Sequence, residues 1–527
     1  MLLDIRTPPP APPAERYDVE AVNSPAHRQP LYAPRRKIFP KRTAGSFRRF
    51  KWIVMAITLT IYYLTPWLRW DRGPFAPHQA VLLDLANRRF YFFFIEIWPQ
   101  EFYYVAGLLV MAGVGLFLIT STVGRAWCGY ACPQTVWVDL FLVVERAIEG
   151  DRNARMKLDA GPWSLDKLVK RLSKHSLWIV IGVVTGGAWI FYFADAPTLM
   201  AQVVSLRAPV VAYGTIGLLA ATTYTFGGIM REQVCTYMCP WPRIQSVMLD
   251  ENSLTVTYNA WRGEPRSRHA KKAIVEGKPV GDCVDCNACV VVCPMGIDIR
   301  EGQQLECITC ALCIDACDNV MDKLGKEKGL ISYATLSDFN ANMALVGAQD
   351  FAGIDPAKAR DSRTGRLVDA VTHTTWRSIV RPRTLIYFVV WASIGLVMLT
   401  VLTMRVPLEL NVLHDRNPQF VRLSDGSIRN GYTLKILNMA QMPSQVALTL
   451  NGLDGAEMTT SEGSGSPVRT MSFNIDPDKV LEAKVFVQLP SAAATAPRDF
   501  HFEVTSADGS ISAVTAAKFE TPAEAPK

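Results

Sequence analysis

The stretch CVDCNACVVVCPMGIDIREGQQLECITCALCIDAC, residues 283–317, holds eight of the 12 cysteines and decides the fold around it. Its first half reads Cys-x2-Cys-x2-Cys-x3-Cys-Pro, and its second half repeats the cysteine spacing with Asp318 in place of the proline. This spacing is typical of a bacterial two-cluster ferredoxin, whereas zinc ribbons use two separated cysteine pairs. The sequence therefore predicts two 4Fe–4S clusters that together form an electron relay.

The same spacing predicts which cysteines bind which cluster. In such ferredoxins three closely spaced cysteines bind one cluster, and the fourth binds the other. The expected ligands of the first cluster are Cys283, Cys286, Cys289 and Cys317. The expected ligands of the second cluster are Cys307, Cys310, Cys313 and Cys293.

Long apolar segments on both sides of this region predict an integral membrane protein. A spanning helix needs about 20 apolar residues. Five segments without Lys, Arg, Asp or Glu approach that length: Trp52–Leu68, Phe102–Val123, Ser176–Ala194, Ala208–Met230 and Leu385–Met404. The stretch Phe90–Trp98 is too short to span, and we expect an interfacial or re-entrant piece there. A sixth span remains open if the region 81–98 inserts.

The distribution of basic residues predicts the orientation of these helices. Lys and Arg are concentrated in residues 1–51, 124–175 and 231–383, and they are sparse in residues 69–101 and 195–207. Because basic loops stay in the cytoplasm, the N-terminus and the clusters are expected inside and the C-terminal region outside. The basic residues near membrane boundaries suit anionic lipid headgroups. The net charge of +7 on 527 residues does not predict nucleic-acid binding.

Two further cysteine pairs follow the second and the fourth apolar segments. They read Cys128-Gly-Tyr-Ala-Cys132-Pro and Cys235-Thr-Tyr-Met-Cys239-Pro, a second internal repeat. If the helices continue to the cysteines, each pair lies on one face at positions i and i+4. Two such pairs on neighbouring helices are candidate ligands for copper, zinc or an iron–sulfur cluster, because all three accept soft thiolates. Alternatively, each pair could cycle between dithiol and disulfide.

The region from Arg405 onward changes to short alternating segments separated by turn residues. Strands are predicted at Thr433–Leu437, Gln445–Leu450, Val468–Ile475, Ala483–Leu489 and His501–Thr505. About 120 residues of this kind fit an immunoglobulin-like β-sandwich without a disulfide, since this region contains no cysteine.

These features divide the chain into six parts. They are a flexible basic N-terminal tail (1–47), a four-helix transmembrane part with two Cys-x3-Cys-Pro motifs (48–250), a ferredoxin-like 4Fe–4S domain (251–330), a cytoplasmic linker (331–384), a fifth transmembrane helix (385–404) and an outer immunoglobulin-like domain (405–527).

This combination of motifs resembles one known family, the cytochrome c oxidase accessory proteins called CcoG or FixG, which include RdxA. The resemblance rests on RRKIFPKR (Arg35–Arg42), WCGYACPQTVW (Trp127–Trp137), CTYMCPWPRIQ (Cys235–Gln245), the paired cluster motifs and the C-terminal sandwich. It implies a cupric reductase of the bacterial inner membrane with a periplasmic C-terminal domain. Such a protein supplies Cu(I) for assembly of the cbb(3)-type cytochrome c oxidase.

The resemblance also implies roles for residues and partners. A cytoplasmic donor would reduce the clusters, and electrons would pass to copper at Cys128, Cys132, Cys235 and Cys239, the expected catalytic residues. The outer domain would contact oxidase subunits or copper chaperones. Two alternatives stay open: a quinol-linked membrane electron-transfer ferredoxin subunit, and a non-catalytic oxidase assembly factor.

Overall fold

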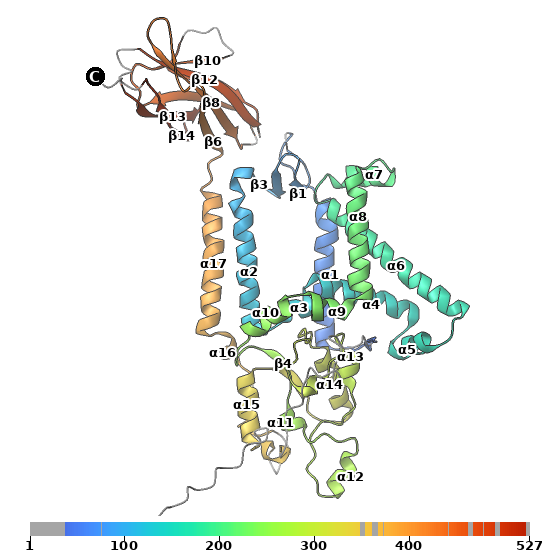
Figure 1. Cartoon of the computed structure of the whole chain (residues 1–527). Coiled ribbons are helices and arrows are strands. Elements are labelled where there is room, and N and C mark those ends of the chain that lie inside the picture. Colours follow the sequence, from blue (N-terminus) through green and yellow to red (C-terminus); the bar gives the residue numbers. More distant parts are fainter. Residues whose placement is uncertain are drawn as a thin grey trace, which may run out of the picture.

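The computed structural model describes residues 37–522 except 75, 348–353, 361–366, 373, 441, 462–466, 478 and 491–495. A set of long helices carries a β-sandwich at one end and the cysteine-rich domain at the other (Figure 1). Most of the expected N-terminal tail, residues 1–47, lies outside the described residues. Its last part, residues 37–47, differs from the expected flexible tail, because the Lys41 amide donates to the Val291 carbonyl and the Phe47 amide donates to Asp315.

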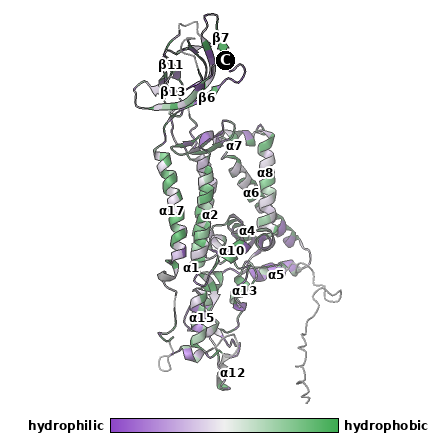
Figure 2. Cartoon of the chain, turned by 60° about the vertical axis from the view of Figure 1, so that its left-hand side comes forward, coloured by the Kyte–Doolittle hydropathy of each residue, from purple (hydrophilic) through white to green (hydrophobic). Residues whose placement is uncertain are grey.

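Each of the five expected apolar segments forms a long helix. The helices are α1 (Ser46–Leu64), α2 (Tyr103–Val123), α6 (Leu165–Ile190), α8 (Val210–Thr223) and α17 (Pro382–Thr403). Within the described residues, three stretches are long and apolar enough to cross a membrane: Pro99–Val123, Val210–Ile229 and Pro382–Thr403. These helices are mostly hydrophobic in Figure 2. Charged residues lie at the start of α1 and along the first half of α6, so a topology of five crossings stays a prediction.

Close packing of small residues joins α6 to α8. A Cβ atom added at Gly182 would lie 2.9 Å from the Ala220 carbonyl oxygen, and one at Gly186 would lie 2.8 Å from the Ile216 carbonyl oxygen. Glycines four residues apart let two helix backbones approach one another, a spacing that is also common in membrane helix pairs. The neighbouring helices are α4 (Pro133–Glu149), α5 (Arg152–Ala160) and α7 (Ala196–Val204).

The region 81–98 is neither a re-entrant segment nor a sixth helix. It folds into an antiparallel three-stranded sheet of β1 (Val81–Asp84), β2 (Arg89–Phe92) and β3 (Ile95–Ile97). Successive side chains of β2 point to opposite faces of this sheet, as they do in any strand. Trp98 then packs against Leu437 and Met439 of the β-sandwich.

The cysteine-rich domain is larger than expected. Strand β4 (Thr255–Tyr258) pairs with β5 (Ile331–Ala334) across the two cluster motifs, with Tyr258 opposite Ile331. Helix α15 (Leu336–Leu345) and the following residues Val346, Ile354, Ala359 and Val371 pack into the same hydrophobic core. The segment 331–384 is therefore not a simple linker, because its apolar residues complete the core of this domain.

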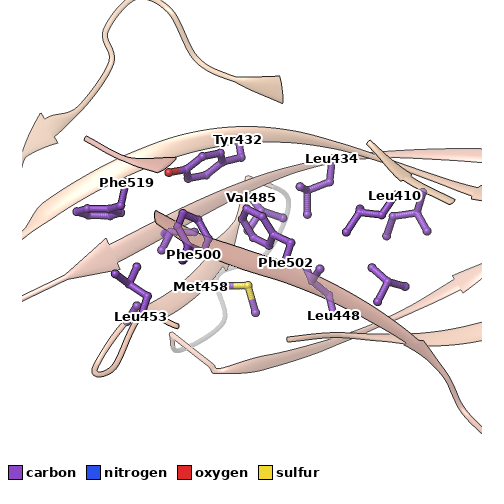
Figure 3. Packing of buried hydrophobic residues seen from close by; sticks show 14 of the residues in the cluster. Leu410, Tyr432, Leu434, Leu448, Leu453, Met458, Val485, Phe500, Phe502 and Phe519 are labelled. Atoms are coloured by element: carbon purple, nitrogen blue, oxygen red, sulfur yellow. The ribbon is translucent and has the colours of Figure 1, made fainter. Parts of the chain in front are cut away.

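The C-terminal domain is the expected β-sandwich. One sheet runs β10-β12-β8-β6 with β7 beside β8, and the other runs β11-β9-β13-β14. The strands are β6 (Leu408–His414), β7 (Val421–Arg422), β8 (Ile428–Asn438), β9 (Ser444–Asn451), β10 (Glu457–Thr460), β11 (Thr470–Ile475), β12 (Lys479–Leu489), β13 (Arg498–Ser506) and β14 (Ser512–Phe519). Figure 3 shows Tyr432, Phe500 and Phe502 packed between the two sheets, all fully buried.

Candidate redox centre

The two cysteine loops of the ferredoxin-like domain follow the same backbone path. In Cys283–Cys289 the residues on either side of the middle cysteine, Asp285 and Asn287, have φ values of 47° and 56°. In Cys307–Cys313 the equivalent residues, Thr309 and Ala311, have φ values of 56° and 59°. Left-handed backbone is unfavourable for threonine and alanine and persists where the surroundings require it. The repeated strain marks two loops that are shaped to present three thiols each.

The thiols group in a crossed arrangement. The pKa of Cys317 is raised to about 12, first by burial and then by the charges of neighbours that include Cys289, Cys283 and Cys286. Burial raises the pKa of Cys293 to about 12, with contributions from Cys310 and Cys307.

Cys313 is subject to the charges of Cys310, Cys307 and Cys293, which add to the effect of burial in raising its pKa. The last thiol of each motif is thus close enough to the loop of the other motif to interact with its charges, and the assignment of ligands to the two clusters stays a prediction.

The eight cysteines of residues 283–317 fit iron–sulfur clusters, because all of them are thiols and they are spaced apart from one another. Cys293, Cys307, Cys310 and Cys313 line one small cavity, and Cys289 lines it as well. Among the described residues, no three Cys, His, Asp or Glu side chains converge as the ligands of a single metal ion do. A cubane cluster binds each thiolate at a different iron atom, so four thiols spread around a cavity suit it better than they suit one ion.

Placing each cysteine pair on one helix face requires a continuous α-helix through both cysteines. Neither Cys-x3-Cys-Pro segment forms such a helix. Helix α2 ends before Gly124, where the chain changes direction. Gly124 has a φ of 60° and lies against the Leu254 carbonyl. The short helix α3 (Ala126–Tyr130) follows, and Cys132 is extended.

The second segment reaches its cysteines through π-helical turns. Helix α8 continues into the π-helix Tyr224–Ile229, then α9 (Arg231–Gln233) and the π-helix Val234–Met238. Cys239 itself is extended, just before α10 (Trp241–Met248). Such π-helical turns are frequent at functional sites.

The four cysteines of the two motifs nevertheless lie together. Burial raises the pKa of Cys235 to about 12, and the charges of Cys132, Cys128 and Cys239 contribute. Burial also raises the pKa of Cys128 to about 11, with contributions from Cys132 and Cys239. These mutual interactions place the four half-buried thiols near one another, and their role as ligands stays a prediction. Their protons would leave as a metal ion binds.

Two glutamines that the motif analysis did not single out connect the two motifs. The Cys128 thiol donates to Gln245 Oε1 at 3.2 Å, and fully buried Gln245 donates to Thr120 Oγ1 at 3.2 Å. In the opposite direction, Gln134 Nε2 donates to the carbonyl oxygens of Phe226 at 2.9 Å and Arg231 at 3.2 Å. A buried amide needs its partners, so each glutamine fixes the other motif. Their only sequence signal is a position shortly after each Cys-Pro pair.

Arg125 joins this site to the ferredoxin-like domain. The buried guanidinium donates to the Pro242 carbonyl at 2.7 Å, to the Cys307 carbonyl at 3.3 Å and to the Leu305 carbonyl. Cys128 packs against the apolar cluster that contains Ile308 and Cys310. The ligand loop of the second predicted cluster is therefore in direct contact with the first Cys-x3-Cys-Pro motif.

Comparisons with known proteins agree with this architecture. Family models match a 4Fe-4S dicluster domain at residues 230–336, a 4Fe-4S binding domain at residues 105–149, and the Ig-like fold at the C-terminal of FixG at residues 398–522. The chain is thus an iron–sulfur protein with an immunoglobulin-like domain and helices able to cross a membrane.

Full-length relatives place it more narrowly. The chain is 69% identical over 475 residues to the nitrogen fixation protein FixG of Rhizobium meliloti, covering 90% of each chain. It is 53% identical to protein RdxA of Cereibacter sphaeroides, covering 84% of this chain and 87% of that one. Protein RdxB of the same organism is 56% identical, covering 77% and 80%. The chain belongs to the FixG/RdxA family, and its iron–sulfur domains define a redox protein.

Proposed function

We propose that the protein is a membrane-bound cupric reductase that reduces Cu(II) to Cu(I). The observation that carries the proposal is the position of Cys128, Cys132, Cys235 and Cys239, which lie together beside the ligand loop Cys307–Cys310. Soft thiolates favour Cu(I) over Cu(II), so a site of this composition promotes reduction of a bound ion.

The electron balance is simple. Each Cu(II) ion takes up one electron and becomes Cu(I), and a cytoplasmic one-electron donor replaces that electron. When bound by the eight cysteines of residues 283–317, iron–sulfur clusters store and pass single electrons. The chain itself contributes the thiols that bind copper, the burial that lowers the local dielectric, and the contact that keeps the two sites adjacent.

An anaerobic single-turnover experiment tests the proposal. The purified protein is reduced, excess reductant is removed, and Cu(II) is added with a Cu(I)-specific chelator while the cluster absorbance is followed. We expect reoxidation of the clusters with one Cu(I) formed for each electron released. A variant with all four motif cysteines replaced by alanine should keep its clusters and lose copper reduction. If clusters stay reduced in the presence of Cu(II), the proposal is wrong.

Iron content distinguishes copper from a third cluster at the same cysteines. The match of a 4Fe-4S binding domain to residues 105–149 includes Cys128 and Cys132, so a cluster there is a defined alternative. A protein with only the dicluster domain loaded holds about eight iron atoms, and a third cluster would bring about four more. We expect the same iron content in the parental protein and in the variant without these four cysteines. A loss of about four iron atoms would assign them to a cluster instead.

A second candidate function, a quinol-linked electron relay, is supported by an apolar groove of about 880 Å³ along α2 and α17. Leu116 and Phe388 lie along the groove, and Trp127 and Trp241 bring it next to the two cysteine motifs. A prenylated quinol would place its tail among such side chains. Reoxidation of the reduced protein by a quinone analogue, lost in Ala112→Trp, would favour this function over copper reduction.

We further propose that the Cu(I) serves assembly of a cbb(3)-type cytochrome c oxidase, with the C-terminal domain contacting oxidase subunits or copper chaperones. This proposal rests on the resemblance of the sequence motifs to the oxidase accessory proteins. The cellular test is the copper content of the oxidase in a strain that carries only the four-alanine variant. A fully copper-loaded oxidase in that strain would contradict the proposal.

A further inference from the structure

The two Cys-x3-Cys-Pro turns share a pattern but meet different surroundings. A Cβ atom at Gly129, inside the first turn, would lie 2.7 Å from the Ile308 carbonyl oxygen and 3.0 Å from the Cys310 Cα. Only glycine fits such an approach of two backbones without displacement. The equivalent residue in the second turn is Thr236, whose hydroxyl bonds back to the Glu232 carbonyl of its own helix at 2.9 Å.

The tyrosines of the two turns, Tyr130 and Tyr237, also differ in their contacts with the ligand loop. Tyr130 is only 7% exposed, and its hydroxyl donates to the Cys310 carbonyl at 3.2 Å. It also lies 3.4 Å from the Tyr333 hydroxyl, which donates to the Thr309 carbonyl at 2.9 Å. Tyr237 of the second turn is 50% exposed. The first turn is therefore bonded to the ligand loop through its tyrosine, whereas the second turn has its tyrosine at the surface.

The basic residues before the two turns diverge as well. Arg125 donates to the carbonyl of Cys307, a cluster ligand. Arg231 instead forms an ion pair with Glu145 of α4 at 2.9 Å. Cys235 of the second turn lines a cavity of about 30 Å³, enough for a small ion or water, and Ile308 of the ligand loop lines the same cavity.

We infer that Gly129 and Tyr130 are positioning residues that hold Cys128 against the loop Cys307–Cys310, so that the first turn receives the electron and the second turn faces the incoming metal ion. This inference rests on the proposed copper reduction and adds a division of labour between the two repeats. The redox balance is unchanged: one electron reaches one Cu(II) ion and forms Cu(I), and the same cytoplasmic donor replaces that electron. What the two residues contribute is a short and constant separation between the two sites.

Exchanging the two residues between the repeats tests this assignment in the holoprotein. Gly129→Thr gives the first turn the residue of the second, and Thr236→Gly is the matched control. Overpacking against backbone should reduce the docked population by about tenfold. We expect kcat for Cu(II) to fall by that factor in Gly129→Thr with KM unchanged, and amide hydrogen exchange at residues 308–311 to accelerate. Thr236→Gly should leave kcat and this exchange at parental values.

Iron content and the spectrum of the reduced clusters show whether each variant is intact. If Gly129→Thr loses iron, Tyr130→Phe replaces it, with Tyr237→Phe as its control. This change removes the hydroxyl that bonds to Cys310 and contacts Tyr333, and it leaves the ring in place. A parental kcat and parental exchange in the first-turn variant, or equal effects in both turns, would overturn the inference. If the parental protein reduces no copper, the proposed function fails, whereas amide exchange in the same variants still decides the docking.

Discussion

Replacing Glu145 by glutamine tests the buried ionic cluster that supports the second cysteine turn. Glu145 lies in α4, and its carboxylate pairs with Arg155 at 3.0 Å, with Arg231 at 2.9 Å and with Lys174 at 3.7 Å. The Arg155 side chain is 0% exposed and that of Glu145 is 6% exposed. One carboxylate therefore ties together four elements of the chain, α4, α5, α6 and α9.

The expected cost follows from this burial. Removing one partner of a buried ion pair typically destabilises a protein by about 3–5 kcal/mol, because the remaining charges stay buried without compensation. Lys174 keeps Glu149 at 2.8 Å, so the lower part of that range applies here. A loss of about 3 kcal/mol corresponds to a fall in Tm of about 6–12 °C for a unit of 150–250 residues.

The assay is thermal unfolding of the detergent-solubilised protein, followed by tryptophan fluorescence. The matched control is Asp166→Asn, which breaks the i, i+4 pair with Lys170 on α6, where the aspartate side chain is 67% exposed. Exposed pairs contribute less than about 1 kcal/mol, so the control should melt within about 2–4 °C of the parent. A Glu145→Gln protein that melts as late as the control would refute the reasoning that this cluster is desolvated.

Three further results are expected. Burial opposes ionisation of Asp139, yet Lys51 and Arg48 hold its pKa below the usual value. The ionised carboxylate therefore stabilises the fold above about pH 4, and this contribution is lost as pH falls through the folded pKa. Asp139→Asn should accordingly flatten the acid side of a plot of Tm against pH. Gly182→Leu should lower stability by about 1–3 kcal/mol through overpacking against α8, and equal melting of Gly187→Leu, whose added Cβ meets nothing within 4 Å, would argue against that contact. Cys317→Ser should remove the same reduced-cluster EPR signal as Cys283→Ser, because these thiols lie in one group; loss of different signals would show that the motifs are not crossed.

The local features of the chain could be predicted from its sequence. Three features depend only on residues that are near neighbours in the chain: the ligand spacing in residues 283–317, the helix-length apolar segments, and the alternating strands from Arg405 onward. Such patterns can be recognised in the sequence without knowledge of the tertiary structure. The crossed ligand grouping follows the spacing for the same reason. The three-stranded sheet at 81–98 was not predicted, because its run of consecutive aromatic residues lacks the alternation with polar residues that marks a half-buried strand.

Long-range packing sets the surroundings of the two cysteine turns. Their convergence was a plausible consequence of the repeat, but helix breaks at Gly124 and in the π-helical turns set the directions of the cysteines. The contact between Gly129 and Ile308 joins residues that are far apart in the chain, and nothing in either local sequence encodes it. The two turns look alike because each is a local motif. They differ in their contacts because the backbone of the first turn lies directly against the ligand loop, a close approach that the glycine at 129 permits.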